Sequence, residues 1–301
     1  MQSVGFYLRN KKVLATGILL RLNKIIPEKL YLKWLFRLNV GYKLNLKNPK
    51  TFNEKLQWLK LYDRKPEYTS LVDKYEVKRI VGKIIGEEHI IPTLGVWNSV
   101  EEIEWDALPN QFVLKTTHGS GGSGVVICKD KNSFDIEDAK RKLKHSLTHS
   151  DTYAHYREWP YKNINRRIIA EKYLSNDKED LNDYKFFCFD GKVKFFKVDF
   201  GRFKEHHANY YDTDGVLLPF GEEVCLPVPE YKITLPSSLE HMKVMATTIS
   251  KGFPFLRVDL YDSNGQIYFG ETTFYPASGM GRFSPASADL DIGNMLTLSL
   301  D

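Results

Sequence analysis

The sequence predicts an α+β fold, in which antiparallel hairpins and helices occupy separate stretches of the chain. Two hairpins support this prediction most strongly. One consists of residues 183–189 and 192–199 around an Asp190-Gly191 turn, and the other spans residues 255–273. Helical patterns lie elsewhere, over residues 135–149 and 237–251 and in two stretches between residues 51 and 86. With 301 residues, the chain is long enough for two lobes rather than one.

The first 50 residues form a basic segment that differs from the rest of the chain. They contain eleven Lys and Arg but a single acid, Glu28, so they carry a net charge of +10 and leave −5 for the remainder. Two amphipathic helices are expected, over residues 10–25 and 28–38, with Pro27 at the start of the second. The longest apolar run, residues 13–20, is far shorter than the roughly 20 residues that span a membrane. No small-residue cleavage site of a signal peptide precedes Arg21.

Two interpretations of this basic segment stay open, and they are compatible. Residues 1–40 can lie on an anionic membrane surface, or the helices can pack on the body of the protein with their lysines in solvent. No recognised nucleic-acid reader motif accompanies the charge, so we expect no nucleic-acid partner. The three cysteines are widely spaced and form no C-x-x-C pair, which argues against zinc and against a disulfide framework. We therefore expect a cytoplasmic protein, with peripheral attachment to the inner face of the plasma membrane as the alternative.

Helical signals begin after the basic segment. Thr51 and Glu54 form a capping box. Pro66 ends that helix, and a second helix is expected from Tyr68 to Ile85, ending at Gly86. Strands are expected over residues 111–115, 125–128 and 167–174.

A glycine-rich loop joins the first two of these strands. Thr116-Thr-His-Gly-Ser-Gly-Gly-Ser-Gly124 contains G-x-G-x-x-G, but a strand follows it, whereas a dinucleotide-binding loop requires a helix there. It also lacks the Gly-Lys-Ser/Thr of a phosphate-binding P-loop. A glycine loop between antiparallel strands is typical of a flap whose backbone N–H groups approach phosphates, and Lys115 stands at its entrance. The alternative interpretation is a flexible hairpin tip.

Two carboxylates, Asp259 and Glu271, mark the last hairpin as a candidate Mg²⁺ site. Side chains alternate between the faces of a strand, so Arg257 shares a face with Asp259. A two-residue Asn264-Gly265 turn would place the two acids on opposite faces.

A three-residue loop over residues 263–265 would instead place Arg257 opposite Glu271, with Asp259 diagonal to it and Thr273 on the same face. We predict this three-residue loop, with Gly265 in the left-handed conformation. The alternative is an ordinary hairpin with a solvated acidic face, since acidic residues are common on surfaces.

In this order, the elements resemble the ATP-grasp superfamily, and within it the TupA-like group, named for teichuronopeptide biosynthesis. The resemblance covers roughly residues 50–301. It rests on Thr51-Phe-Asn-Glu-Lys-Leu-Gln-Trp58, Asp73-Lys-Tyr75, Phe112-Val-Leu-Lys-Thr-Thr-His-Gly-Ser-Gly-Gly122, Ile169-Ala-Glu-Lys-Tyr-Leu174, Asp183-Tyr-Lys-Phe-Phe-Cys-Phe-Asp-Gly-Lys192, Arg257-Val-Asp259 and Glu271-Thr-Thr-Phe274.

The resemblance implies an ATP-grasp fold in which two α+β lobes clasp ATP. The expected boundaries are 1–50 for the basic helical segment, 51–110 for a helical region, 111–175 for the small lobe with its flap, and 176–301 for the large lobe with the Mg²⁺-binding hairpin. For nucleotide binding, the implied residues are the phosphate-contacting Lys74 and Lys115, the flap residues His118, Gly119, Ser120, Gly121 and Gly122, the hinge residues Glu171, Lys172 and Leu174 facing adenine, and Asp183 at the ribose or hinge.

The resemblance also implies catalytic roles. Asp259, Glu271 and Thr273 would bind Mg²⁺, and Arg257 would steady the transferred phosphoryl group. Arg202, or in second place Lys197, would contact the γ-phosphate. The familiar Glu-x-Asn metal motif reads Glu271-Thr272-Thr273 here, which predicts a more weakly held metal or a substrate-orienting role for Thr273.

The activity implied is that of an ATP-dependent carboxylate–amine ligase that works through an acyl phosphate. The implied substrates are an amino acid or amine and a uronic acid of a cell-surface polysaccharide, of capsule, O-antigen or teichuronic type, or its precursor. Two other functions stay open: an ATP-dependent sugar or polysaccharide kinase, and a non-catalytic glycan or membrane adaptor that retains the fold.

Overall fold

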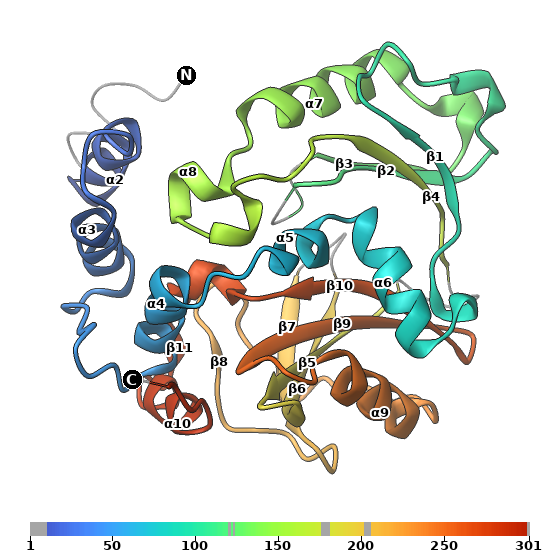
Figure 1. Cartoon of the computed structure of the whole chain (residues 1–301). Helices are drawn as coiled ribbons and strands as arrows, with labels where there is room; N and C mark the ends of the chain where they lie inside the picture. Colours follow the sequence, from blue (N-terminus) through green and yellow to red (C-terminus); the bar gives the residue numbers. More distant parts are fainter. Residues whose placement is uncertain (1–10, 120–121, 123, 176–180, 202–205, 300–301) are drawn as a thin grey trace.

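Two large antiparallel sheets and one two-stranded sheet, with separate helices, form the described part of the molecule, which confirms the predicted α+β class (Figure 1). The computed structural model describes residues 11–119, 122, 124–175, 181–201 and 206–299. One large sheet has four strands in the order β1-β4-β2-β3, and the other has five in the order β10-β9-β5-β6-β7. Each large sheet has its own cluster of buried apolar residues, so the two lobes have separate cores.

The smaller sheet contains the strands that flank the glycine loop. Its strands are β1 (Thr93–Trp97), β2 (Phe112–Thr116), β3 (Val125–Cys128) and β4 (Ile168–Lys172), and α7 (Ile136–His149) packs against β2 and β3. The N-cap Asp135 begins α7 by accepting a hydrogen bond from the Asp138 backbone N–H at 2.9 Å. Because β1 pairs with β4, this sheet includes residues that precede the expected lobe boundary at 111.

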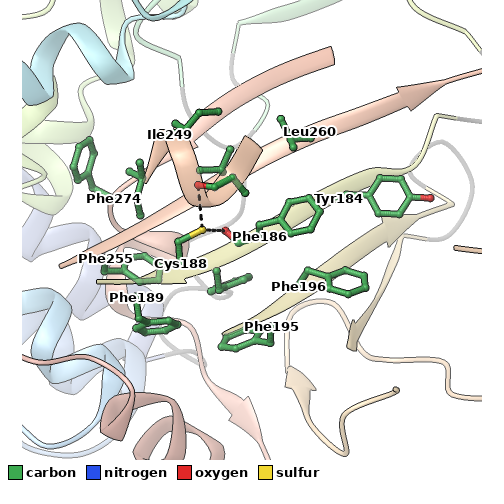
Figure 2. Close-up of a cluster of buried hydrophobic side chains, with 14 of the residues drawn as sticks. Tyr184, Phe186, Cys188, Phe189, Phe195, Phe196, Ile249, Phe255, Leu260 and Phe274 are labelled. Carbon is green, nitrogen blue, oxygen red and sulfur yellow. Dashed lines mark hydrogen bonds between the residues drawn. The ribbon is translucent and has the colours of Figure 1, made fainter. Parts of the chain in front are cut away.

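The larger sheet has an apolar core to which α9 (Leu239–Ile249) and the helices α4 (Phe52–Tyr62), α5 (Glu67–Val72) and α6 (Glu76–Ile85) contribute buried residues. Its strands are β5 (Asp183–Phe189), β6 (Lys192–Phe200), β7 (His207–Asp212), β9 (Phe255–Ser263) and β10 (Gln266–Thr273), and α9 contacts β5, β6 and β9. Figure 2 shows the aromatic side chains of this core around Cys188, whose thiol donates to the Ala246 carbonyl oxygen at 3.7 Å. Burial raises the pKa of that thiol to about 12, so Cys188 is an inert core residue.

The helices before the small lobe differ in one respect from the prediction. The capping box of Thr51 and Glu54 begins α4 (Phe52–Tyr62) as expected. The single helix expected over residues 68–85 is instead two, α5 (Glu67–Val72) and α6 (Glu76–Ile85). Asp73 causes the break, because its Oδ1 accepts hydrogen bonds from the backbone N–H groups of Tyr75 and Glu76 at 2.8 and 3.1 Å.

The two expected N-terminal helices are present as α2 (Lys11–Arg21) and α3 (Glu28–Val40). They form a third cluster of buried residues and lie at one side of the molecule (Figure 1). Among the described residues, no helix has both the length and the apolar character needed to cross a bilayer. The remaining elements are short: α8 (Thr152–Tyr156), α10 (Ala288–Asn294), β8 (Gly221–Glu222), β11 (Phe283–Ser284), and the 3₁₀ turns η1 (Glu87–His89), η2 (Trp105–Ala107), η3 (Lys131–Ser133), η4 (Trp159–Tyr161) and η5 (Pro276–Gly279).

Candidate active site

The turn of the last hairpin differs from the prediction. Ser263 pairs with Gln266, so the loop is the two-residue Asn264-Gly265 turn, with both residues at positive φ (55° and 86°). The predicted three-residue loop over 263–265 is therefore wrong.

Asp259 and Glu271 nevertheless share a face, because a β-bulge at Gly270 shifts the register. Phe269 pairs with Leu260, and the next pair is Glu271 with Asp259. Glycine suits this position, since a Cβ on Gly270 would lie 2.8 Å from the ring of Tyr261 and 3.1 Å from the Asp259 carbonyl oxygen. The extra residue reverses the alternation of β10 and brings the two acids directly opposite each other.

Arg257 joins the residues of this acidic face. Its Nε and Nη2 donate to the two oxygens of Asp259, both at 2.7 Å. Nη2 also lies 3.3 Å from Glu271 Oε1 and 3.0 Å from the Thr273 hydroxyl. Burial by itself would lower the pKa of the guanidinium, but Asp259 and Glu271 raise that pKa well above its ordinary value. The cation and the three expected metal-binding side chains thus form one hydrogen-bonded cluster.

Lys185 is a second cation of this face, which the sequence analysis did not identify. Its ammonium lies 2.6 Å from Asp183 Oδ2, 2.6 Å from Asp259 Oδ2 and 3.6 Å from Asp199 Oδ2. Lys185 pairs with Asp259 across β5 and β9, and its side chain is buried. These acids outweigh the effect of burial and raise the pKa of Lys185 well above its usual range. Asp183, expected at the ribose or hinge, therefore contacts Lys185 in this structure.

Of the two residues expected at the γ-phosphate, the structure describes Lys197 but not Arg202. Lys197 lies on β6, where its ammonium is 3.0 Å from Glu222 Oε2 and 3.5 Å from Asp199 Oδ1. Both acids form ion pairs with Lys197, which lies at the edge of the cluster on the same sheet as Lys185. Arg202 lies outside the described residues.

The opposite side of the site begins at Lys74, in the break between α5 and α6. Its backbone N–H donates to the Thr117 carbonyl oxygen at 3.1 Å, and its ammonium donates to the Gly119 carbonyl oxygen at 2.6 Å. The same ammonium lies 3.5 Å from Glu271 Oε2. Lys74 therefore connects the glycine flap to the acidic face. Arg167, which lies 2.9 Å from Asp73 Oδ2, holds the segment in place.

Lys115 is paired with a buried carboxylate. Glu171 lies between two ammonium groups, with Oε2 at 2.6 Å from Lys115 and Oε1 at 2.6 Å from Lys78. Burial alone would raise the pKa of Glu171, but Lys115 and Lys78 lower it to about 2. Its carboxylate thus positions Lys115, while its expected contact with adenine stays a prediction. Of the other two expected hinge residues, Lys172 is exposed and Leu174 is half-buried.

The flap residues beside Lys74 include a buried histidine. The Nε2–H of His118 donates to the Ser146 carbonyl oxygen at 3.2 Å, and its Nδ1 has no hydrogen-bond partner among the described residues. Burial lowers the pKa of His118 to about 4, so its imidazole is neutral near pH 7 and does not act as a cation toward phosphate. Gly122 has φ of 80°, which favours glycine. Ser120 and Gly121 lie outside the described residues.

The chain that leaves β10 is strained next to the site. Ala277 and Ser278 both have positive φ, at 46° and 55°. The buried ammonium of Lys60 donates to the Ser278 carbonyl oxygen at 2.6 Å, and the Ser278 hydroxyl donates to Glu158 Oε1 at 2.5 Å. Strained backbone that buried contacts hold in place is found mainly at binding sites, so this segment is a candidate wall for a second substrate.

The acidic face suits a divalent cation, with Glu271 as its most accessible ligand. The Glu271 side chain is 40% exposed. Desolvation alone would raise its pKa, but the neighbouring cations Lys74 and Arg257 lower that pKa to about 2. Asp259 Oδ2 already accepts hydrogen bonds from Arg257 and Lys185, whereas Oδ1 accepts one from Arg257 and has a further lone pair. Carboxylate and hydroxyl oxygens are the donors that Mg²⁺ prefers.

Comparisons with known proteins identify the family. The sequence model of the family described as TupA-like ATPgrasp matches residues 54–297. A search of curated proteins gives no match.

Among solved structures, the chain is similar to D-alanine–D-alanine ligase from Bacillus anthracis (17% identity, 76% of this chain, 64% of that chain, TM-score 0.43). It is also similar to D-alanine–D-alanine ligase from Helicobacter pylori (13%, 83% and 70%, 0.41) and to phosphoribosylamine–glycine ligase from Thermotoga maritima (16%, 69% and 48%, 0.41). The chain thus spans 64% of the length of the Bacillus anthracis ligase chain. Structural similarity at these TM-scores does not indicate a function.

The family match covers most of the sequence and includes Lys74, Lys115 and the whole acidic hairpin. The chain therefore belongs to the TupA-like ATP-grasp family.

Proposed function

We propose that the protein is an ATP-dependent carboxylate–amine ligase. One observation supports this most directly. The Arg257, Asp259 and Glu271 cluster faces the flap-linked Lys74, whose ammonium is 3.5 Å from Glu271. Cations and metal-binding oxygens thus meet where the flap of the small lobe approaches the large sheet, an arrangement suited to a nucleotide triphosphate.

The residues suit a reaction in which ATP activates a carboxylate. A carboxylate resists attack by an amine, so the carboxylate oxygen first attacks the γ-phosphorus of ATP and releases ADP. The amine then attacks the acyl carbon of the acyl phosphate, and inorganic phosphate leaves with the electron pair of the C–O bond. Lys74, Lys115 and Arg257 would neutralise the negative charge of the phosphates during transfer. When bound, Mg²⁺ at Glu271, Asp259 and Thr273 would add a Lewis acid that polarises the phosphoryl oxygens.

His118 is unsuited to deprotonating the amine near neutral pH. Its pKa near 4 makes it a weak base, and its Nε2 proton is donated to the Ser146 carbonyl oxygen. The amine therefore has to reach the acyl phosphate as its free base or lose its proton to solvent or to substrate.

For the substrates, we propose a uronic acid of a cell-surface polysaccharide, or of its precursor, as the carboxylate, and an amino acid or other amine as the nucleophile. The resemblance to the TupA-like group, which is named for teichuronopeptide biosynthesis, supports this choice, and the match of the TupA-like family model over residues 54–297 strengthens it. The strained segment around Ser278, next to the acidic face, is the candidate wall for the acceptor.

The test is a matrix of uronic acids against amines, with ATP and Mg²⁺, scored by ADP release and product mass. The expected result is ADP and phosphate only when both substrates are present, together with an amide product. Arg257→Gln should abolish this reaction. Arg282→Gln is the matched control, because the Arg282 side chain forms a half-exposed ion pair with Glu223, and the substitution should leave the rate unchanged.

Two outcomes would overturn the proposal. ADP formed with a hydroxyl acceptor, together with a stable phosphate ester, would make the protein a kinase. Failure of the wild-type protein to bind ATP would make it a non-catalytic adaptor.

A further inference from the structure

The helical hairpin formed by α2 and α3 has an inner face that packs and an outer face that does not. Tyr31, Leu32, Leu35 and Phe36 of α3 are completely buried, in a cluster that also includes Met280. The hairpin is fixed to α8 as well, since the Tyr31 hydroxyl donates to the His155 carbonyl oxygen at 2.7 Å. The hairpin is therefore a firmly attached part of the structure.

The outer face of the hairpin is apolar although it is exposed. Ile18 is 49% exposed, Trp34 47% and Ile25 79%, and Leu22 lies exposed beside them. A groove of about 550 Å³ runs between the two helices, lined by Ile18, Leu22, Ile26, Trp34, Arg37 and Leu38. Isolated exposed apolar residues are common on protein surfaces, but a contiguous set of this kind marks an interaction site. We call this set the outer apolar face.

Exposed cations surround the outer apolar face. Arg21, Lys24, Lys33 and Arg37 all lie on the surface of the hairpin. None of these four forms an ion pair with another described residue. The only acid within residues 11–50 is Glu28, and its Oε1 forms an ion pair with Arg64 Nη2 at 2.7 Å. The face thus combines a strip of aliphatic and indole side chains with positive charge that no acid neutralises.

We propose that the outer apolar face docks on an anionic phospholipid bilayer. Exposed apolar side chains flanked by Lys and Arg fit the boundary between head groups and acyl chains, where the cations meet lipid phosphates and the apolar groups leave water. Trp34 suits this boundary, because its indole has an apolar body and a polar N–H. A second copy of the chain would bring a second set of the same cations to the contact, so charge complementarity favours the lipid surface.

Docking in this way would bring the active site close to the membrane. Met280 packs in the core of the hairpin and lies two residues after the strained Ser278. A membrane-bound hairpin would therefore hold the candidate acceptor wall near lipid-linked acceptors. This consequence rests on the proposed function, whereas the docking itself does not.

The experiment measures co-sedimentation of the full-length protein with phosphatidylcholine vesicles and with vesicles of phosphatidylcholine and phosphatidylglycerol at 3:1. We expect binding to the anionic vesicles that weakens with added salt and is at least tenfold stronger than binding to the neutral ones. The quadruple variant R21Q/K24Q/K33Q/R37Q should bind roughly 700-fold more weakly, since each cation near an anionic surface adds about fivefold. The double variant I18S/W34S should also lose binding.

The matched control neutralises four exposed cations of α7 in K140Q/R141Q/K142Q/K144Q. It changes the net charge by the same amount and should bind vesicles nearly as the wild type does. Unfolding midpoints in urea establish that all variants are folded. Because no step of the assay involves catalysis, its failure is distinct from a failure of the proposed ligase reaction.

Three results would overturn the proposal. The first is equal binding of wild type and quadruple variant, or an α7 control as weak as the quadruple variant. The second is self-association of the wild type that I18S/W34S abolishes, without vesicle binding, which would assign the face to a second copy. The third is vesicle binding that appears only after residues 1–10 are removed, which would assign the face to that segment.

Discussion

Replacing Glu171 by Gln tests the charge arrangement that holds Lys115. The substitution keeps the shape of the side chain but leaves two ammonium groups, of Lys78 and Lys115, without the carboxylate that lies 2.6 Å from each. The pKa of Glu171 falls from 4.5 to about 2 in the folded chain, and at 1.36 kcal/mol per unit this corresponds to about 3 kcal/mol of stabilisation of the ionised form. Removal of one partner of a buried ion pair costs a similar amount.

The stabilisation that the Glu171 carboxylate provides depends on pH. Because the folded-state pKa lies below the unfolded value of 4.5, the stabilisation is complete above that pH and declines as the pH falls toward 2. Urea unfolding followed by tryptophan fluorescence should show E171Q to be about 3 kcal/mol less stable at pH 7. At pH 3.5 the wild type loses about 1.4 kcal/mol of this advantage, so the difference between the two proteins narrows.

The matched control is Glu137→Gln, which removes an exposed carboxylate 2.7 Å from Lys140 and should leave the unfolding midpoint unchanged. An E171Q protein as stable as the wild type at pH 7 would contradict this role of the carboxylate. A stability difference that stays constant between pH 4.5 and pH 3.5 would contradict it as well.

Four further predictions follow from the site. Gly270→Ala should lower ATP-dependent turnover at least tenfold with circular dichroism unchanged, because the new Cβ displaces the bulge that aligns the acids; normal turnover would contradict this role. Lys185→Met should cost about 3–5 kcal/mol in urea unfolding, and the double variant Asp183→Asn/Lys185→Met should recover part of it; an undisturbed single variant would show that the ammonium is not needed there. The His118 ring should not titrate between pH 5 and pH 8 in NMR spectra, and a midpoint near 6.5 would show that the ring is solvated. Glu271→Gln should raise the Mg²⁺ concentration needed for half-maximal turnover at least tenfold, and an unchanged requirement would remove this residue from the metal site.

Strand alternation allowed part of the acidic hairpin to be predicted. It placed Arg257 and Asp259 on one face, and both lie there. The loop was predicted wrongly because an odd-numbered loop was the simplest way to bring Glu271 to that face. The chain instead combines the favoured Asn264-Gly265 turn with a bulge at Gly270. An isolated glycine within a strand pattern is a signal for such a bulge, and here it was the relevant one.

Long-range register explains what the sequence could not predict. Lys185 meets Asp259 across strands that are 74 residues apart, and no local pattern sets which residues of β5 and β9 face each other. The break before α6 is a different case, because the apolar pattern continues across residues 68–85 while a single Asp73 side chain ends one helix and begins the next. Contacts of individual side chains therefore determine both the place of Lys185 in the site and the break between α5 and α6.

The pairing of the site's cations with its own acids would make nucleotide binding and metal binding mutually dependent. A phosphate that draws Arg257 away from Asp259 and Lys74 away from Glu271 would leave Asp259 with Lys185 as its remaining partner and Glu271 short of positive charge. A divalent cation that binds those carboxylates would restore the balance, and it would also release the two side chains toward the phosphate. Each ligand should therefore tighten the other by the same factor, as thermodynamic linkage requires. ATP without Mg²⁺, or Mg²⁺ without ATP, should bind this protein far more weakly than the two together.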